Sequence, residues 1–367
     1  MTPSTAAIWD PRYLLHDTGL WHPERPERLQ AIKKVLDKFT SPERGVEGEA
    51  RSGFAGRGGD ASPLLTRLEP RMATPEEISL VHDSEYVKKI EETAGHDIQL
   101  DPDTPVSPKS WEAACLAVGG MLTAVDWILE GVGTGGATGG GPPPDRSEAR
   151  TAGGYGSDRT RSHNAFAFVR PPGHHAERAR AMGFCLFNNV AIAAEYALRK
   201  PGIGKVLIVD YDVHHGNGTQ SAFYDRNDVF YISTHRYPFY PGTGARKEEG
   251  TGKGKGFTLN VPFSGGQGDE EYLKAFDDEI IPAARDFGPD LILISAGYDA
   301  HRLDPLGGMN VTSKGFAEMT RRILEIADQS CSGKVLCVLE GGYSLEGLAE
   351  SVEECLKAMT DYSLFKS

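Results

Sequence analysis

The sequence predicts an α/β fold in which helices cover both faces of a parallel β-sheet. The second half of the chain contains short apolar runs rich in β-branched residues, and helix-like stretches lie between most of them. Strands that are apolar along their whole length are typical of a sheet buried on both faces. The expected strands lie at 165–169, 205–212, 229–234, 257–263, 291–297 and 334–342.

Apolar residues at helical spacing predict the helices. The stretch 110–130 carries the clearest stripe, which is typical of a core helix. Residues 41–63 and 131–161 lack such periodicity and are rich in glycine, and we interpret them as surface insertions within one domain that spans residues 1–367. The expected helices lie at 26–39, 78–92, 110–130, 188–199, 270–287 and 313–329.

The composition excludes several classes of protein. The chain has 367 residues, 39% of them hydrophobic, with 39 Lys and Arg against 52 Asp and Glu and a net charge of −13. This composition is that of a globular protein, and its acidity disfavours direct binding of nucleic acid while favouring cationic substrates. The first residues show no secretory signal, and no apolar run approaches the roughly 20 residues that cross a bilayer, so we expect no membrane partner.

The cysteines indicate a reducing compartment. Their number is odd and their spacing includes no CxxC pair. We therefore predict buried free thiols and a cytoplasmic location rather than a disulfide framework. The five residues are Cys115, Cys185, Cys331, Cys337 and Cys355.

Acidic and imidazole side chains follow two of the expected strands. Asp210, Asp212 and His214 end one run, and Asp299 follows another. In open α/β sheets, ligands bind beyond the carboxyl ends of the strands. In an extended backbone, side chains two apart share a face, so Asp212 and His214 can reach one cation, with Asp299 as a third ligand. Such a set suits Zn²⁺, with Fe²⁺ or Co²⁺ as alternatives, and leaves a coordination position open. The plainer interpretation is a hydrogen-bonded Asp–His pair that caps a helix.

Two consecutive imidazoles follow a stiff Pro-Pro-Gly turn. His174 and His175 are suited to general acid–base catalysis if the turn holds them in a fixed orientation. Asp210 and Asn217 are available as one partner for each ring, and a carboxylate partner favours the imidazolium whereas an amide adds no charge. The alternative is a surface loop with two solvated rings.

A single tyrosine follows two glycines near the end of the last expected strand. Tyr343 is either an ordinary loop-edge residue or a phenol that donates a hydrogen bond to a developing oxyanion.

Seven segments together resemble the histone deacetylase family, class II and its bacterial deacetylase and acetylpolyamine amidohydrolase relatives in particular. Asn217 and Glu340 stand where class I enzymes carry Asp and Gly, and both fit class II. The matching segments occur in the family's order and are HPERPERL (22–29), RPPGHHA (170–176), GFCLFNN (183–189), DYDVHHGNGTQ (210–220), STHRYPFYPGTG (233–244), SAGYDAHRLDPLGG (295–308) and EGGY (340–343).

The resemblance implies a single-domain arginase–deacetylase fold with an eight-stranded parallel sheet. It implies one Zn²⁺ held by Asp212, His214 and Asp299, and a structural K⁺ near Asp210, Ser233 and Thr234 together with Asp212 and His214. It also implies His175 as the general base with His174 as its partner, Asp210 and Asn217 behind them, and Tyr343 as the catalytic tyrosine.

The same resemblance implies a narrow channel for an acyl-lysine chain. The implied reaction is hydrolysis of an acetyl or related acyl amide by a metal-activated water. The channel residues would be Phe184 and Tyr240 as aromatic walls, Gly183, Leu306 and, at the rim, Asp103.

Other functions remain open at this point. An arginase-like dinuclear site would need a D-x-H-x-D pattern, but Gly216 takes the third position and His301 lies two residues past Asp299. An acetylpolyamine amidohydrolase is the nearest alternative, although Leu306 stands where some polyamine-preferring relatives carry Glu. From another class, a catalytically inactive binding protein would share the fold. Acetylated lysine in protein or peptide and acetylated polyamine are thus both candidate substrates, and homo-oligomerisation stays open.

Overall fold

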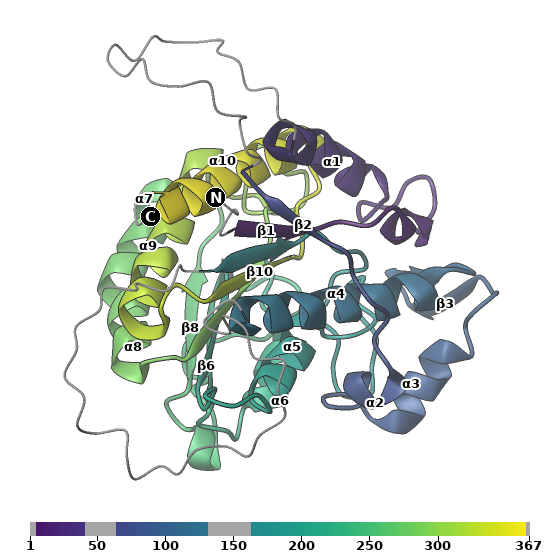
Figure 1. Cartoon of the computed structure of the whole chain (residues 1–367), viewed down its shortest axis with the longest axis horizontal. Coiled ribbons are helices and arrows are strands. Elements are labelled where there is room, and N and C mark those ends of the chain that lie inside the picture. The colour runs from purple at the N-terminus through teal and green to yellow at the C-terminus, as the bar shows by residue number, and fades with distance from the viewer. Residues whose placement is uncertain (1–4, 41–63, 131–162, 365–367) are drawn as a thin grey trace, which may run out of the picture.

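The computed structural model describes residues 5–40, 64–130 and 163–364. Its centre is an eight-stranded, entirely parallel sheet with strand order β2-β1-β5-β10-β9-β6-β7-β8 (Figure 1). The central strands are buried on both faces, as their continuous apolar sequences predict. The sheet strands are β1 (Thr5–Ile8), β2 (Thr66–Leu68), β5 (Asn164–Ala167), β6 (Val206–Asp210), β7 (Val229–Arg236), β8 (Thr258–Phe263), β9 (Leu291–Ala296) and β10 (Val335–Leu339).

Helices cover the sheet on both sides. One layer contains α1 (Glu27–Thr40), α7 (Asp269–Ala275), α8 (Ile281–Phe287), α9 (Ser313–Cys331) and α10 (Leu345–Leu364), which pack against one another (Figure 1). The opposite layer contains α4 (Ser110–Glu130), α5 (Asn189–Ala197) and α6 (Asn217–Phe223). The predicted α/β architecture is therefore confirmed. Smaller elements are η1 (Pro11–Leu15), α2 (Pro75–Ile78), α3 (Ser84–Glu91), β3 (Ile98–Asp101), β4 (Thr104–Val106), η2 (Gly252–Gly254) and η3 (Phe276–Ile280).

The prediction of a helix over 78–92 is wrong in its first half, where the chain forms no continuous helix. A capping box at Thr74 starts the separate helix α2, which ends at Ile78. Asp83 then takes an extended backbone with ψ of 137°, and its N–H donates to the carbonyl of Arg178 at 3.0 Å. Because the chain leaves the helical path to bond a distant loop here, α3 begins only at Ser84.

Several elements were not predicted by periodicity, among them the short helix α6 and the strands β3 and β4. Strands β1 and β2 are only four and three residues long, too short for a clear alternation of apolar and polar residues. Helix α10 was also missed, although it packs on both α1 and α9. The predicted helix over 270–287 is present as α7, η3 and α8 in continuous succession, with one wider π-type turn in its middle.

The expectation that no segment is long and apolar enough to cross a membrane is wrong for helix α4. By length and composition Ser110–Glu130 passes that test, but 72% of its most apolar stretch is buried inside the protein. Its side chains lie in the hydrophobic core beneath β1, β5 and β10. This environment is that of a core helix, as its apolar stripe predicts.

The five cysteines are free and buried, in agreement with the prediction. The proposed insertions at 41–63 and 131–161 lie outside the described residues. Because all strands of the sheet run parallel, the segments that follow β5, β6, β9 and β10 leave the sheet at the same edge. That edge carries the side chains considered next.

Candidate active site

Two carboxylates and one imidazole converge beyond the ends of β6 and β9. His214 Nδ1 lies 3.2 Å from Asp212 Oδ1 and 3.0 Å from Asp299 Oδ2. The candidate ligand atoms of all three residues lie within 4.8 Å of one another, and both aspartates are fully buried. Among the described residues, this is the only cluster of His, Cys, Asp and Glu with metal-ligand spacing.

Backbone hydrogen bonds orient the two carboxylates. Asp212 Oδ1 accepts the N–H of His214 at 2.9 Å, and its Oδ2 accepts the N–H of Gly341 at 2.8 Å. Asp299 Oδ1 accepts the N–H of Val213 at 2.8 Å, which leaves Oδ2 directed at His214. One oxygen of each carboxylate is thus anchored by the backbone that follows β6.

The electrostatics of this cluster suit a cation. Burial and the adjacent Asp212 carboxylate raise the pKa of Asp299 to about 7. Two buried carboxylates this close are costly to ionise together unless a positive charge lies between them. Two oxygen ligands and one nitrogen ligand form a donor set that Zn²⁺ accepts.

The path of the chain differs from the extended segment assumed in the sequence argument. Strand β6 ends at Asp210, and 211–216 form bends and turns. Asp212 and His214 still converge, because the N–H of His214 bonds the Asp212 side chain. Asp210 points elsewhere, to His174 and to the hydroxyl of Tyr231 at 3.0 Å.

The two consecutive histidines have different partners. His174 Nδ1 lies 3.1 Å from Asp210 Oδ2, and His175 Nδ1 lies 2.8 Å from Asn217 Oδ1. Burial lowers the pKa of His174, but the Asp210 and Asp212 carboxylates outweigh it and raise that pKa to about 10. Burial and the neighbouring His174 hold the pKa of His175 well below its usual value. The pair therefore combines a charged ring with a neutral one.

A buried carboxylate holds the histidine loop in place. Glu340, directly after β10, accepts the N–H of Gly173 at 2.7 Å and that of His174 at 3.2 Å. Its other oxygen lies 3.3 Å from Ser295 Oγ. The sequence singled out Glu340 only as a class II feature, whereas its contacts show that it fixes the turn before the imidazole pair.

Tyr343 lies at the wall of the same pocket. Its ring contacts Phe184 edge-on with centroids 5.9 Å apart, and the Arg28 guanidinium lies 5.1 Å from its centroid. A Cβ at Gly341 would collide with the Asp299 carboxylate, so glycine lets this strand end approach the candidate ligands closely. Burial and Asp299 raise the pKa of Tyr343 well above its usual value, so the phenol keeps its proton.

The pocket above the candidate metal group is narrow, with a volume of about 90 Å³. Tyr240 stands edge-on to His175 at 5.1 Å between centroids, while Tyr240 and Leu306 are 37% and 39% exposed at the mouth. All the predicted channel residues line it, together with the histidines and Pro172, Gly341 and Tyr343. They are Asp103, Gly183, Phe184, Tyr240 and Leu306.

An unusual backbone presents Phe184 to the pocket. Gly183 and Phe184 both have positive φ, 56° and 69°. A Cβ at Gly183 would collide with the His175 ring, so this position requires glycine on both grounds. The N–H of Gly183 donates to Asp103 Oδ1 at 3.2 Å, and that of Phe184 to Thr104 Oγ1 at 3.1 Å. Asp103 thus supports the aromatic wall in addition to lying at the rim.

The residues implied for potassium lie on β6 and β7. Ser233 pairs with Asp210 across these strands, and Ser233 Oγ lies 2.8 Å from His235 Nδ1. The buried hydroxyl of Thr234 has no hydrogen-bond partner within the described part of the chain. A buried hydroxyl without a partner is costly. Because Ser233 and Thr234 are consecutive on β7, their side chains point to opposite faces of the sheet.

Sequence reasoning missed a buried charged network behind the pocket. Glu24 bonds Arg170 through two nitrogens, at 2.5 and 2.7 Å, and Arg28 at 3.0 Å, and all three are fully buried. Arg28 in turn donates to the carbonyls of Gly342 at 2.7 Å and Glu340 at 2.6 Å. A sequence signal for this network was present, because its three charged residues lie in the segments HPERPERL and RPPGHHA, which the family resemblance singles out.

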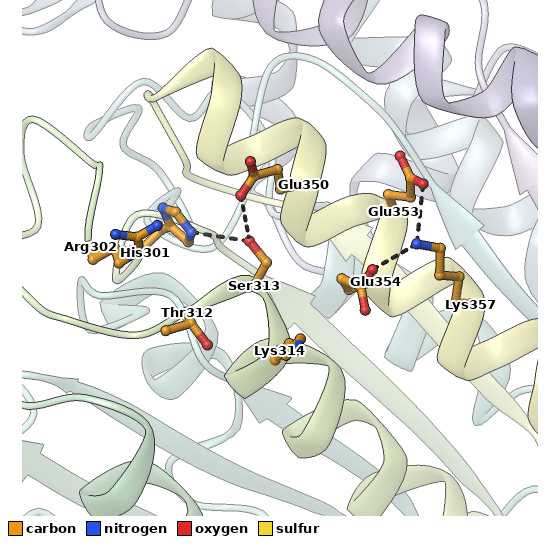
Figure 2. A pocket seen from close by; sticks show the side chains of 9 residues that line it. All are labelled: His301, Arg302, Thr312, Ser313, Lys314, Glu350, Glu353, Glu354 and Lys357. Atoms are coloured by element: carbon orange, nitrogen blue, oxygen red, sulfur yellow. Dashed lines mark hydrogen bonds and ion pairs between the residues drawn. The ribbon is translucent and has the colours of Figure 1, made fainter. Parts of the chain in front are cut away.

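A second and larger hollow lies between α9 and α10, which we call the α9–α10 groove. Its volume is about 620 Å³. Figure 2 shows that its side chains pair with each other: Ser313 with His301 at 3.1 Å and Glu350 at 3.3 Å, and Lys357 with Glu353 and Glu354. His301, the residue two past Asp299, faces this groove and not the candidate metal group. The groove is lined by His301, Arg302, Thr312, Ser313, Lys314, Glu350, Glu353, Glu354 and Lys357.

Comparisons with known proteins agree on one family. Residues 22–359 match the Histone deacetylase domain family. The chain is 38% identical over 346 residues to "Histone deacetylase 10, chloroplastic" of Oryza sativa subsp. japonica, covering 92% of this chain and 69% of that protein. It is 37% identical to a "Probable deacetylase" of Archaeoglobus fulgidus, covering 94% and 82%. The crystal structure of the HDA15 HD domain superposes with a TM-score of 0.80 at 38% identity, covering 98% of this chain and 88% of that one.

Proposed function

The chain belongs to the histone deacetylase family, and from the contents of its pocket we propose that it is a zinc-dependent deacetylase that acts on acetylated lysine side chains. Family membership supports a deacetylase hydrolase, while the metal and the substrate are our inference. The observation that carries the proposal is the convergence, in one narrow pocket, of a three-residue ligand group, an asymmetric histidine pair and a protonated phenol.

Asp212, His214 and Asp299 would hold the metal ion. When bound, Zn²⁺ supplies a Lewis acid that polarises the amide carbonyl and lowers the pKa of a water ligand to about 7. The two convergent buried carboxylates support this assignment, since their charges call for a cation. A structural K⁺ near Asp210, Ser233 and Thr234 is part of the same proposal and rests on the family resemblance.

The histidine pair would move protons. His175 is neutral because its pKa is held low, so it can accept the proton of the attacking water as general base. Asn217 bonds its Nδ1 and thereby leaves Nε2 available to the pocket. His174, kept as the imidazolium by Asp210, carries the positive charge that favours protonation of the leaving amine.

Tyr343 would stabilise the oxyanion that forms when the amide carbonyl is attacked. Its phenol stays protonated and borders the pocket beside Gly341 and His175. A donor of this kind typically contributes on the order of 10²–10³ in rate. The aromatic walls Phe184 and Tyr240 and the narrowness of the pocket, whose volume is about 90 Å³, suit a linear alkyl chain.

The test is a direct comparison of substrates with the purified chain. We expect about one Zn²⁺ per chain by elemental analysis and release of acetate from acetyl-lysine peptides that stops on chelation and returns with Zn²⁺. Acetylated putrescine and cadaverine serve as parallel substrates. A higher kcat/KM for these than for the acetyl-lysine peptide would show that the substrate is an acetylated polyamine and not acetylated lysine. Full activity after exhaustive metal removal would contradict the mechanism.

A further inference from the structure

One carboxylate outside the ligand group joins two parts of the pocket wall. Asp304 lies in the loop between β9 and α9. Its Oδ2 accepts the N–H of Tyr343 at 2.7 Å and that of Ser344 at 3.3 Å. Its Oδ1 accepts the N–H of Leu306 at 2.9 Å and that of Gly307 at 3.1 Å. A single side chain thus bonds four backbone donors, two beside the phenol and two beside the channel mouth.

The backbone before Tyr343 needs such an anchor. Gly341 and Gly342 precede it, and Gly342 has a φ of 114°, a region that other residues rarely adopt. Glycines give the chain more freedom than any other residue, so the placement of the phenol depends on bonds from neighbouring segments. Arg28 fixes the carbonyl of Gly342, and Asp304 fixes the N–H of Tyr343 itself.

The loop that carries Asp304 is attached to the candidate metal ligand. A Cβ at Gly307 would collide with the carbonyl oxygen of Asp299, so the two backbones are in close contact. The carbonyl of Gly307 also accepts from Arg236 Nη1 at 3.1 Å, and the N–H of Asp304 donates to the carbonyl of His301 at 2.8 Å. A chain of contacts therefore runs from Asp299 through Gly307 and Asp304 to Tyr343.

We propose that Asp304 is a positioning residue that holds Tyr343 at the correct distance from the candidate metal ligands. Through its bonds to Leu306 and Gly307, it also ties the position of Tyr343 to the mouth of the channel. The proposal rests on the proposed function, because it assigns Asp304 no chemistry of its own. Misplacing a catalytic group by about 1 Å is expected to reduce the rate on the order of 10²-fold. Loss of the Asp304 contacts should act on kcat more than on KM.

Asp304→Asn is the variant that tests this role. The amide keeps the size of the side chain but accepts hydrogen bonds at only one of its two polar atoms, so it cannot bond both pairs of N–H donors. We expect kcat to fall roughly 10-fold to 100-fold with the metal content unchanged. In the Tyr343→Phe background the same substitution should cost no more than about 2-fold, since the phenol it positions is already absent.

Asp269→Asn is the matched control. Asp269, the first residue of α7, also has a carboxylate that bonds another segment, accepting from Thr312 N at 2.8 Å and Thr312 Oγ1 at 2.6 Å, but it does not line the pocket. We expect its kcat to stay within about 2-fold of the unmodified enzyme, as for a substitution remote from the chemistry. An equal loss from Asp304→Asn with and without the Tyr343 phenol would overturn the proposal, because it would show a general structural effect.

Amide hydrogen exchange on the unmodified chain tests the same contact without turnover. We expect the N–H groups of Tyr343 and Ser344 to exchange slowly because Asp304 accepts both, and unprotected amides at both positions would overturn the proposal. This measurement stays decisive if Asp304→Asn does not fold. It also separates the proposed function from the role of Asp304. Absence of deacetylase activity would refute the function, whereas the exchange rates would still report on the Asp304 hydrogen bonds.

Discussion

The candidate active-site pocket is smaller than the α9–α10 groove, but it holds the more reactive arrangement of side chains. The groove has a volume of about 620 Å³ and the pocket one of about 90 Å³. In the groove, however, Ser313 bonds His301 and Glu350, and Lys357 lies between Glu353 and Glu354 (Figure 2). In the pocket, two buried carboxylates converge on one imidazole and a protonated phenol stands beside them. Convergent groups with uncompensated charge, and not volume, therefore mark the site.

The largest effect of a substitution is expected at the three candidate metal ligands of the pocket. Asp299→Ala removes one ligand and should lower both metal content and kcat/KM, the latter on the order of 10³-fold or more. Elemental analysis and acetate release measure the two effects on the same sample. A variant that retained its metal and its activity would remove Asp299 from the ligand set.

Tyr343→Phe should give the next largest effect. Loss of one oxyanion donor is expected to cost on the order of 10²–10³ in kcat, while metal content and thermal stability stay close to those of the unmodified chain. The measurement is kcat on an acetyl-lysine peptide together with a melting curve. Unchanged turnover would refute the oxyanion role of the phenol.

Glu24→Gln should affect stability, since it leaves Arg28 and Arg170 buried without their carboxylate. Removing one partner of such a network is expected to cost roughly 3–5 kcal/mol. Burial raises the pKa of Glu24, but Arg170 and Arg28 outweigh it and lower that pKa from 4.5 to about 2.

The sign of the pH dependence follows from this lowered pKa. The unfolded chain takes up the proton first as pH falls, so the stabilisation by Glu24 is complete above about pH 4.5 and is lost as the pH approaches 2. The stability gap between the unmodified chain and Glu24→Gln should therefore be about 2 kcal/mol smaller at pH 3 than at pH 7. Denaturant unfolding at both pH values measures it, and a gap that widened in acid would contradict the assignment.

The smallest effect is expected in the groove. Lys357→Glu breaks two ion pairs that are 40% exposed at the lysine, so it should cost at most about 1 kcal/mol of stability. Because the groove lies apart from the pocket, kcat/KM should stay within about 2-fold. A loss comparable to that of Tyr343→Phe would mean that the groove takes part in the reaction and would abolish the contrast.

The reliability of sequence prediction varied with the length and regularity of the element. The stretch 110–130 was predicted with its observed bounds, because its apolar stripe continues for five turns. The prediction of one helix over 78–92 was wrong, because a tertiary hydrogen bond at Asp83 interrupts the helix although the apolar pattern continues through it. Strands β1 and β2 are stabilised mainly by their neighbours in the sheet and carry too few residues to show a period.

For the site, residue types at strand ends pointed to His174, His175, His214 and Tyr343, all of which line the pocket. The channel residues came from the family resemblance and not from the strand pattern; they are Asp103, Gly183, Phe184, Tyr240 and Leu306. The supporting roles of Glu24, Asp304 and Glu340 were not predicted, since these residues act through hydrogen bonds to segments far away in the chain. Such partners leave no periodic signal in the sequence. Their roles follow only when the two ends of each contact are seen together.

The order of amino acids by itself determined the alternation of buried strands and helices and the kinds of chemical group available, because both follow from local apolar patterns and side-chain chemistry. The tertiary structure decided which of these groups meet and in what electrostatic state. His174 and His175 are adjacent and identical in type, yet the Asp210 carboxylate raises the pKa of one, while burial and the neighbouring His174 lower the pKa of the other. Strand order brings the loop after β5, which carries the two histidines, to the same end of the sheet as their partners Asp210, at the end of β6, and Asn217, at the start of α6, and no local pattern encodes that meeting.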